Sequence, residues 1–146
     1  MQYRLALDID APHARVVELF LDPGTLSAWQ PDLVSFETIP GADPRAVGAK
    51  SRQVHKMGKR EVVMVETITV HDFPERFAAS YEADKVWTLV ETRFVEVDAE
   101  TTRWIVDNTF KCGGVVRLMA MLFPAMFRKQ TLTFMQRFKD YVESAG

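Results

Sequence analysis

The sequence predicts an α+β protein with the helix-grip arrangement, in which a seven-stranded antiparallel sheet wraps around a long C-terminal helix. Three observations carry this prediction. The chain begins with alternating polar and apolar residues, continues through β-rich runs separated by short turns, and ends in a helical periodicity. Connections this short join antiparallel strands, because parallel strands need crossovers of a dozen or more residues.

The first element is a strand, and two short helices follow it. Polar residues alternate with Tyr3, Leu5, Leu7 and Ile9 in the predicted strand. Asp10-Ala11-Pro12 then predicts a helix start with Asp10 as the capping residue. A second helical segment covers Thr25 to Trp29 and ends before Pro31, because the residue preceding a proline is pushed out of helical geometry.

The middle of the chain is predicted to form the other six strands. Turn residues separate the runs, namely Pro40-Gly41 with Asp43-Pro44, Gly58, Asp72-Phe73-Pro74, Asp84-Lys85 and Asp98-Ala99-Glu100. The predicted strands are Asp32–Thr38, Lys50–Met57, Arg60–His71, Arg76–Ala83, Val86–Val97 and Thr102–Lys111. With the first strand they make the sheet.

The last element is one long helix. After Cys112-Gly113-Gly114, apolar residues recur every three or four positions as far as Tyr141, which predicts a helix over Gly114–Ser144. Pro124 lies inside this range, so we expect a bend there.

Composition narrows the class of protein. The 146 residues are 47% hydrophobic and 26% charged, which is typical of one folded domain covering residues 1–146. A formal net charge of -2 does not favour a nucleic-acid partner. The apolar stretch from Val115 to Phe127 contains Arg117 and is too short for a transmembrane segment. The single Cys112 and a first segment unlike a signal peptide favour the cytoplasm.

No metal or cofactor is expected. His13, His55 and His71 are far apart and lack the spacing of ligands on one helix or strand. The chain contains no glycine-rich phosphate loop and no nucleophile elbow.

Several short motifs resemble the polyketide cyclase/dehydrase and lipid-transport branch of the START-like (SRPBCC) superfamily. They are Ile9-Asp10-Ala11-Pro12, Leu26-Ser27-Ala28-Trp29-Gln30-Pro31, Val47-Gly48, Glu66, Asp72-Phe73-Pro74-Glu75-Arg76-Phe77, Thr101-Thr102, and Phe127-Arg128-Lys129-Gln130-Thr131 leading to Phe138-Lys139. The resemblance covers essentially the whole chain and implies a cavity between the sheet and the long helix. It leaves function open, because the superfamily includes carriers, enzymes and chaperone regulators.

Strand alternation identifies polar candidates for that cavity. Glu66 shares a face with Val62, Met64, Ile68 and Val70 if no β-bulge intervenes. Asn108 shares a face with Trp104, Val106 and Phe110, and Tyr81 with Phe77 and Ala79. His55 cannot be placed, because its strand is polar on both faces. A bulge that turns Glu66 to solvent, or an ion pair with Arg52 or Arg93, would be a purely structural alternative.

The expected ligand is a hydrophobic small molecule, such as a lipid or a polyketide-like aromatic compound. Besides Glu66, Asn108 and Tyr81, the predicted binding residues are Trp29, Met64, Ile68, Val106, Met119, Phe123, Phe127 and Phe134. Trp29, Met119 and the phenylalanines serve equally well as core residues.

Two other classes of function remain open. The first is a cyclase or dehydratase with Glu66 or His55 as base and Asn108 or Tyr81 polarising a carbonyl. The second is a protein-interaction or chaperone-regulating module. The apolar side of the first half of the long helix, around Met121 and Ala125 between Arg117 and Arg128, also suggests a homodimer or a transient membrane contact.

Overall fold

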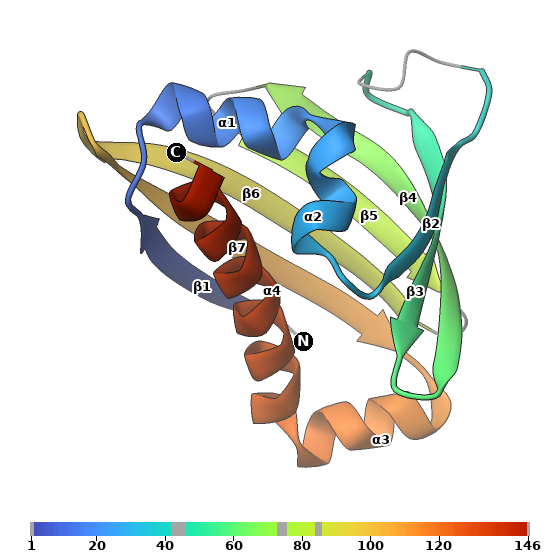
Figure 1. Ribbon diagram of the computed structural model, residues 1–146. Helices are drawn as coiled ribbons and strands as arrows, with labels where there is room; N and C mark the ends of the chain where they lie inside the picture. The colour runs from blue at the N-terminus through green and yellow to red at the C-terminus, as the bar shows by residue number, and fades with distance from the viewer. Residues whose placement is uncertain (1, 42–45, 73–75, 84–85, 146) are drawn as a thin grey trace.

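In the computed structural model, a curved seven-stranded antiparallel sheet carries the C-terminal helix and the helical insertion that follows the first strand on its concave side (Figure 1). The structure describes residues 2–41, 46–72, 76–83 and 86–145. The strands are β1 (Gln2–Ile9), β2 (Leu33–Thr38), β3 (Lys50–Met57), β4 (Arg60–Asp72), β5 (Arg76–Ala83), β6 (Val86–Asp98) and β7 (Thr101–Cys112). The helices are α1 (His13–Leu21), the 3-10 turn η1 (Pro23–Thr25), α2 (Leu26–Trp29), α3 (Gly114–Leu122) and α4 (Pro124–Ala145).

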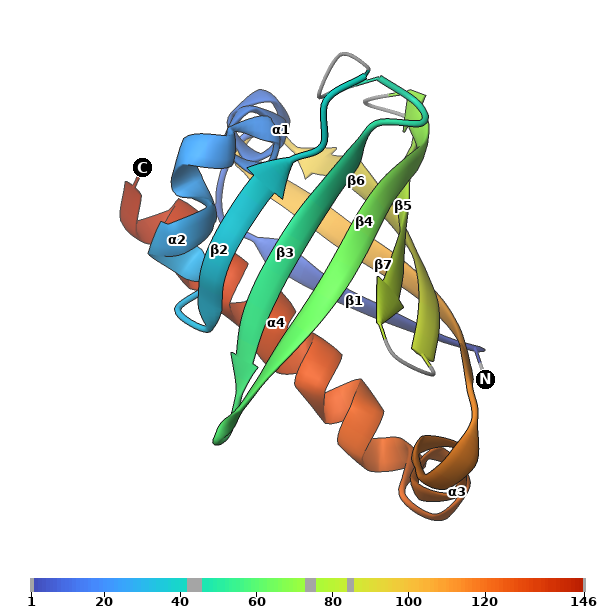
Figure 2. The ribbon, with the colours of Figure 1, turned by 90° about the vertical axis from the view of Figure 1, so that its right-hand side faces the viewer.

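The strand order is β1-β7-β6-β5-β4-β3-β2, so the first and last strands of the chain are neighbours (Figure 2). The helical insertion α1–α2 carries the chain across the concave face from β1 to β2 at the opposite edge. The predicted helix-grip class and the predicted strands are confirmed, with strand ends shifted by one residue at most. The predicted turns at Asp43-Pro44, Phe73-Pro74 and Asp84-Lys85 lie outside the described residues.

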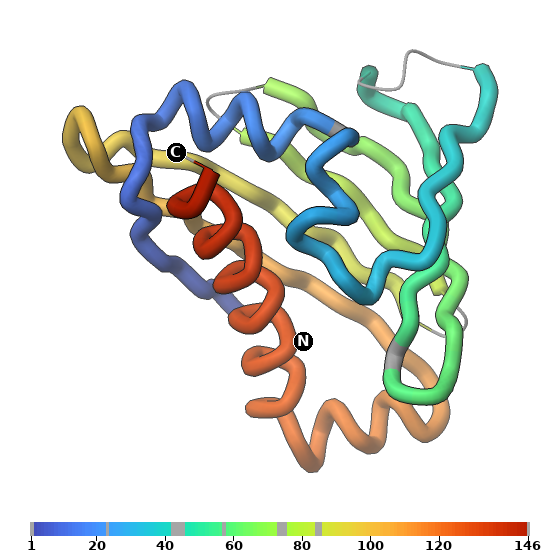
Figure 3. Tube along the Cα trace, viewed as in Figure 1, coloured from blue at the N-terminus to red at the C-terminus, as the bar shows by residue number. Residues whose placement is uncertain are grey.

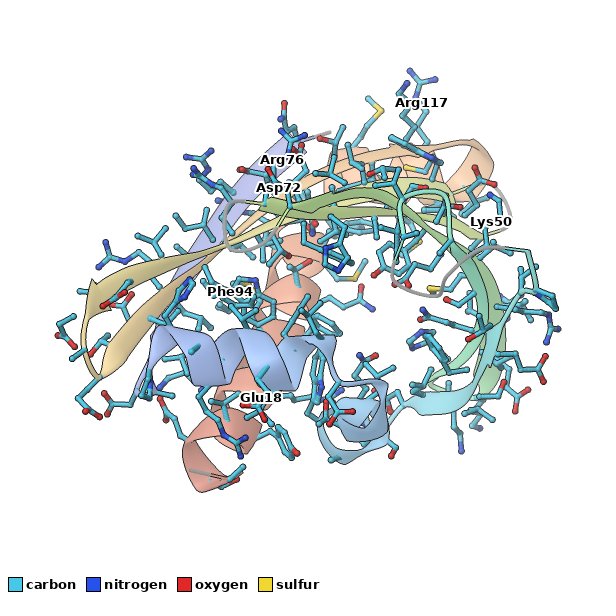
Figure 4. The ribbon with its side chains drawn as sticks, turned by 90° about the horizontal axis from the view of Figure 1, so that it is seen from above. Glu18, Lys50, Asp72, Arg76, Phe94 and Arg117 are labelled. Carbon is cyan, nitrogen blue, oxygen red and sulfur yellow. The ribbon has the colours of Figure 1, made fainter. Side chains whose placement is uncertain are left out.

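The packed core occupies the end of the grip beneath α1 and the C-terminal half of α4. Trp104 of β7 and Phe138 of α4 are fully buried there, with ring centroids 5.2 Å apart. Phe94 of β6 lies between the sheet and α1 (Figure 4) and stacks edge-on against Phe20 of α1 at 5.2 Å. These edge-to-face pairs add to the burial of the rings and fix α4 on the sheet.

The expected capping role of Asp10 is wrong. Helix α1 begins at His13 with Pro12 as its N-cap residue, and no side chain caps it. Asp10 lies two residues too early, and its backbone N–H donates instead to Glu143 of α4 at 2.8 Å.

The single long helix over Gly114–Ser144 is also corrected, because the structure divides it into α3 and α4. Phe123 separates them with a non-helical backbone (φ -131°, ψ 59°). Proline disfavours helical geometry in the residue before it and lacks an N–H, but it is well suited to the first position of a helix. Pro124 therefore ends α3 and starts α4, and the chain turns sharply between them (Figure 3).

Replacing a phenylalanine by alanine should lower the free energy of unfolding by different amounts in α4 and at the break. Phe138→Ala should lower the free energy of unfolding by about 3–5 kcal/mol, because it leaves a cavity among buried rings. Phe123→Ala removes the same atoms from a side chain that is 57% exposed and should cost less than about 1 kcal/mol. Urea denaturation of both variants measures the difference, and equal losses would contradict the described core.

Candidate functional site

Alternation along β4 places Glu66 on the concave face, between one residue of β3 and one of β5. The sheet register sets Glu66 opposite Ser51 on one side and opposite Tyr81 on the other. A β-bulge does occur in β4, but it lies between Ile68 and Val70, beyond Glu66. The bulge does not turn Glu66 to solvent.

The bulge changes which residues of β4 follow Ile68 on the concave face. His71 is paired with Phe77 and lies against its ring at 5.5 Å, whereas Val70 is paired with Ala78. The prediction that Val70 shares the face of Glu66 is therefore wrong, because the extra residue reverses the alternation. Arg52 and Arg93 are paired with Val65 and Ile105, on the face opposite to Glu66, so neither forms the proposed ion pair.

Glu66 is held by neutral hydroxyl groups. The Ser51 hydroxyl donates to Glu66 Oε1 at 3.4 Å, and the Tyr81 hydroxyl also hydrogen-bonds to the carboxylate. The pKa of Tyr81 is raised well above its ordinary value, first by burial and then by the negative charge and hydrogen bond of Glu66. Tyr81 therefore stays protonated and donates to Glu66 over the whole physiological range.

The hydrogen bonds continue along β3 to His55. Gln53 Nε2 donates to the Ser51 hydroxyl at 3.2 Å, and His55 Nε2 lies 2.9 Å from Gln53 Oε1. Since an amide oxygen can only accept a hydrogen bond, His55 donates through Nε2, and this nitrogen carries a proton. The polar row, defined as His55, Gln53, Ser51, Glu66 and Tyr81, thus spans three strands without a break.

Burial keeps His55 neutral. It lowers the pKa of the imidazole from its ordinary value of 6.5, and the nearby negative charge of Asp32 offsets only part of this effect. The row therefore contains one acidic group at Glu66 and a neutral imidazole at the far end.

A second polar cluster lies at the other side of the concave face. Asn108 of β7 donates through Nδ2 to the Tyr3 hydroxyl at 3.0 Å and to Thr131 Oγ1 of α4 at 3.1 Å. The Tyr3 hydroxyl oxygen and Thr131 Oγ1 are hydrogen-bonded to each other at 2.7 Å. Asn108 Oδ1 is buried and has no hydrogen-bond partner within the described part of the chain. A buried acceptor in this state favours a donor from a water or a ligand.

The two polar clusters are separated by an apolar floor. Asn108 is paired with Val90, Val90 with Ala79, and Ala79 with Ile68, which precedes the bulge on β4. Three strand spacings separate β7 from β4, about 14 Å along the sheet. Asn108 and Glu66 therefore cannot contact one small group together, but they can contact opposite ends of an elongated molecule.

Solvent reaches this part of the concave face. Met64, Glu66, Tyr81 and Val90 point toward the helices, yet each is only half-buried. Inward-pointing residues at the other end of the sheet, such as Trp104 and Val106, are fully covered. Solvent therefore reaches single side chains on this part of the face, whereas Ser51, Gln53, Ile68 and Ala79 among them are buried.

The remaining predicted binding residues divide between core and surface. Trp29 is buried in the core, with ring centroids 4.8 Å from Phe134 and 4.9 Å from Phe138. Outside the grip, Trp29 also borders a surface depression formed with Pro31, Arg137 and Tyr141. Phe127 is half-buried and stacks on Phe110 at 5.1 Å, close to the Asn108 cluster.

Met119 and Phe123 are more exposed than either of their predicted roles, ligand binding or core packing, implies. Their exposed fractions are 40% and 57%. The break at Pro124 directs α3 away from the axis of α4, so the regular spacing of apolar residues no longer keeps both halves on one face.

Sequence reasoning missed Ser51, Gln53, Tyr3 and Thr131. Ser51, Gln53 and His55 do alternate along β3, but the intervening residues are also largely polar, so alternation alone could not choose a face. Tyr3 lies beside Asn108 because β1 pairs with β7, and Thr131 joins them because α4 crosses these two strands. Within the described ranges, no group of three His, Cys, Asp or Glu side chains is arranged to hold a metal ion.

Comparison with known proteins defines the family. The model of the family described as "Polyketide cyclase / dehydrase and lipid transport" matches residues 3–143, and the chain belongs to this family. Comparison with curated proteins gave no match.

Solved structures share the fold at low sequence identity. A Thermus thermophilus protein is 19% identical with a TM-score of 0.79, covering 100% of this chain and 99% of its own. Zhui aromatase/cyclase from a Streptomyces species is 13% identical with a TM-score of 0.78, covering 98% and 93%. Norcoclaurine synthase from Thalictrum flavum, solved with dopamine and hydroxybenzaldehyde, is 13% identical with a TM-score of 0.75, covering 100% and 88%.

The lowered pKa of His55 predicts a pH-dependent stability. The unfolded chain binds a proton at His55 below about pH 6.5, before the folded chain does, so acidification favours unfolding. The His55 contribution to the free energy of unfolding should be fully present above that pH, decrease below it, and level off below the folded pKa.

His55→Gln removes this titration and leaves all other groups in place. We expect the stability of the wild type relative to His55→Gln to fall as the pH decreases from about 7.5 to about 5.5 in urea denaturation. A constant difference would show that His55 is not desolvated in the folded protein.

Proposed function

We propose that the protein binds a hydrophobic small molecule, aromatic or lipid-like, between the concave face of the sheet and α4. The observation that carries the proposal is Glu66, a half-buried carboxylate of the polar row that lies beside the apolar residues Met64 and Ile68 of the same strand face. Neutral hydroxyls are its hydrogen-bond partners among the described residues. A half-buried charge without a cationic partner lowers the stability of the fold. Such a cost favours a role for the charge in binding a ligand.

The two polar clusters suggest the chemistry of the ligand. Glu66 accepts hydrogen bonds, and so does the unpartnered Oδ1 of Asn108. A complementary molecule carries a hydrogen-bond donor, such as a hydroxyl or an amine, at one or both ends of an apolar body of about 14 Å. Val90, Ala79 and Ile68 form the floor for that body.

The relatives support this class of ligand. The family description combines polyketide cyclases with lipid transport, and the norcoclaurine synthase structure contains two aromatic compounds. We also propose a cytoplasmic location, which the single cysteine favours.

A second candidate function is catalysis of a dehydration or cyclisation. The hydrogen bond between Glu66 and Tyr81 places a base and a proton donor together. Glu66 would remove a proton from the carbon next to a carbonyl, and the Tyr81 hydroxyl would turn from Glu66 to donate its one hydrogen bond to the carbonyl oxygen. In a β-hydroxyketone, the C–O bond of the resulting enolate breaks, the leaving hydroxyl takes the proton from Glu66, and water and an enone are released with the carboxylate restored. Asn108 is too distant to assist the same atom, so Glu66 and Tyr81 are the catalytic pair in this proposal.

The binding proposal is tested with Glu66→Gln. Gln retains the size and hydrogen-bonding ability of Glu66, and no basic partner on the described face is left unpaired, so stability should change by less than about 1 kcal/mol. A panel of phenols, aromatic amines, hydroxylated polycyclic aromatics and fatty acids is screened by thermal denaturation. A ligand at a hundred times its Kd should add about 2.7 kcal/mol to the stability of the wild type.

Glu66→Gln should weaken a donor-bearing ligand from this panel at least tenfold, which corresponds to about 1.4 kcal/mol. Glu82→Gln is the matched control, since Glu82 is an exposed residue of β5. Failure of every compound class to stabilise the wild type, or equal affinity in both variants, would contradict the proposed site.

The catalytic proposal is tested with Tyr81→Phe and an aryl β-hydroxyketone. Loss of the hydroxyl should reduce dehydration by about 10²–10⁴-fold, whereas binding of the product enone should change less than tenfold. Release of the enone is followed by absorbance. Turnover by Tyr81→Phe at the wild-type rate would remove Tyr81 from the mechanism, and absence of turnover in the wild type would leave binding as the function.

A further inference from the structure

The most unusual surface of the molecule is the helix α3. Seven of its nine residues are apolar, and Arg117 is its only charged residue. Val115 is 72% exposed, Met121 69% and Leu122 63%, whereas only Ala120 is buried. A helix that is apolar on nearly all sides is normally buried in a protein or in lipid.

The apolar surface continues past the end of α3. Leu118, Phe123 and Met126 are also large, apolar and exposed, so the patch covers α3 and the first turn of α4. We call this set, with Val115, Met121 and Leu122, the α3 patch. Contiguous apolar surface of this kind marks an interaction site.

The charged residues next to the α3 patch in the sequence all have one sign. Between Thr109 and Gln136 the sequence contains four basic residues and no acidic one, although the whole chain has a net charge of -2. Lys111 precedes α3, Arg128 and Lys129 follow the patch, and Arg117 extends away from the body of the molecule (Figure 4).

We propose that the α3 patch docks on the surface of an anionic lipid bilayer. Exposed apolar side chains bordered by lysine and arginine are what an interfacial helix requires, because the apolar groups enter the acyl boundary and the cations attract anionic headgroups. α3 has nine residues and is about 14 Å long, so it lies in the interface. No helix in the described part of the chain has the length and hydropathy to cross a membrane.

Charge favours this partner over a second copy of the chain. A symmetric dimer through the α3 patch would bring two basic segments face to face, and their repulsion would oppose the burial of the apolar residues. An anionic bilayer satisfies both the apolar and the basic groups. The inference does not depend on the proposed ligand, because neither the polar row nor Asn108 enters it.

The test measures co-sedimentation of the purified protein with vesicles. We expect binding to phosphatidylcholine vesicles that contain phosphatidylglycerol, weak binding to phosphatidylcholine alone, and a decrease in binding with added salt. Arg117→Gln should weaken binding to the anionic vesicles about fivefold, because each lysine or arginine near an anionic surface contributes about that factor to the affinity.

Met121→Gln/Leu122→Gln tests the apolar contribution without a change in charge. Both positions are exposed, so the variant should fold normally while binding at least tenfold more weakly. Val95→Thr/Val97→Thr is the matched control, because these valines are exposed on β6. Its binding should equal that of the wild type.

Light scattering on the same samples separates the alternatives. A monomeric wild type that binds anionic vesicles through the α3 patch supports the proposal. A dimer that Met121→Gln/Leu122→Gln dissociates would assign the patch to a second copy and overturn it. Equal binding to neutral and anionic vesicles, no binding to either, or unaltered binding of the double variant would also overturn it.

Discussion

The packing of Phe138 against Trp104 and Phe94 determines how the rest of the molecule is arranged. These three rings join the last helix to β7 and β6, and Phe20 of α1 closes over them. Because strands twist, a seven-stranded sheet that packs on one helix curves around it and cannot contact it along its whole width. The core therefore fills one end of the concave face and leaves Met64, Glu66 and Tyr81 on β4 and β5 only half-buried.

That division separates structural from chemical roles on a single face. At the closed end, the inward-pointing residues are aromatic or aliphatic and fully buried. At the accessible end, the polar row replaces them, and each of its members finds a partner within the row. A sheet can hold such a row at little cost to folding, because the hydrogen bonds offset part of the cost of burial and the remaining surface faces solvent.

The sequence predicted what alternation and short turns determine locally. It located the strands to within one residue and placed Glu66 on the concave face, because β4 is apolar at every second position up to the bulge. It could not locate the bulge, which depends on the pairing with β5. Nor could it orient β3, where Arg52 and Lys56 alternate with Gln53 and His55. The contact between Asn108 and Thr131 joins positions 23 residues apart that only the crossing of α4 brings together.

Pro124 shows why one pattern can have two structural outcomes. Apolar residues keep a helical spacing on both sides of it, so the pattern alone predicts one bent helix. Proline is equally favourable as the first residue of a new helix, and Phe123 before it leaves helical geometry. Only α4 then follows the sheet and supplies Phe138 and Thr131. α3 points in another direction and carries an apolar surface that the described chain leaves exposed. Pro124 therefore separates the residues that pack against the sheet from those that are available to a partner.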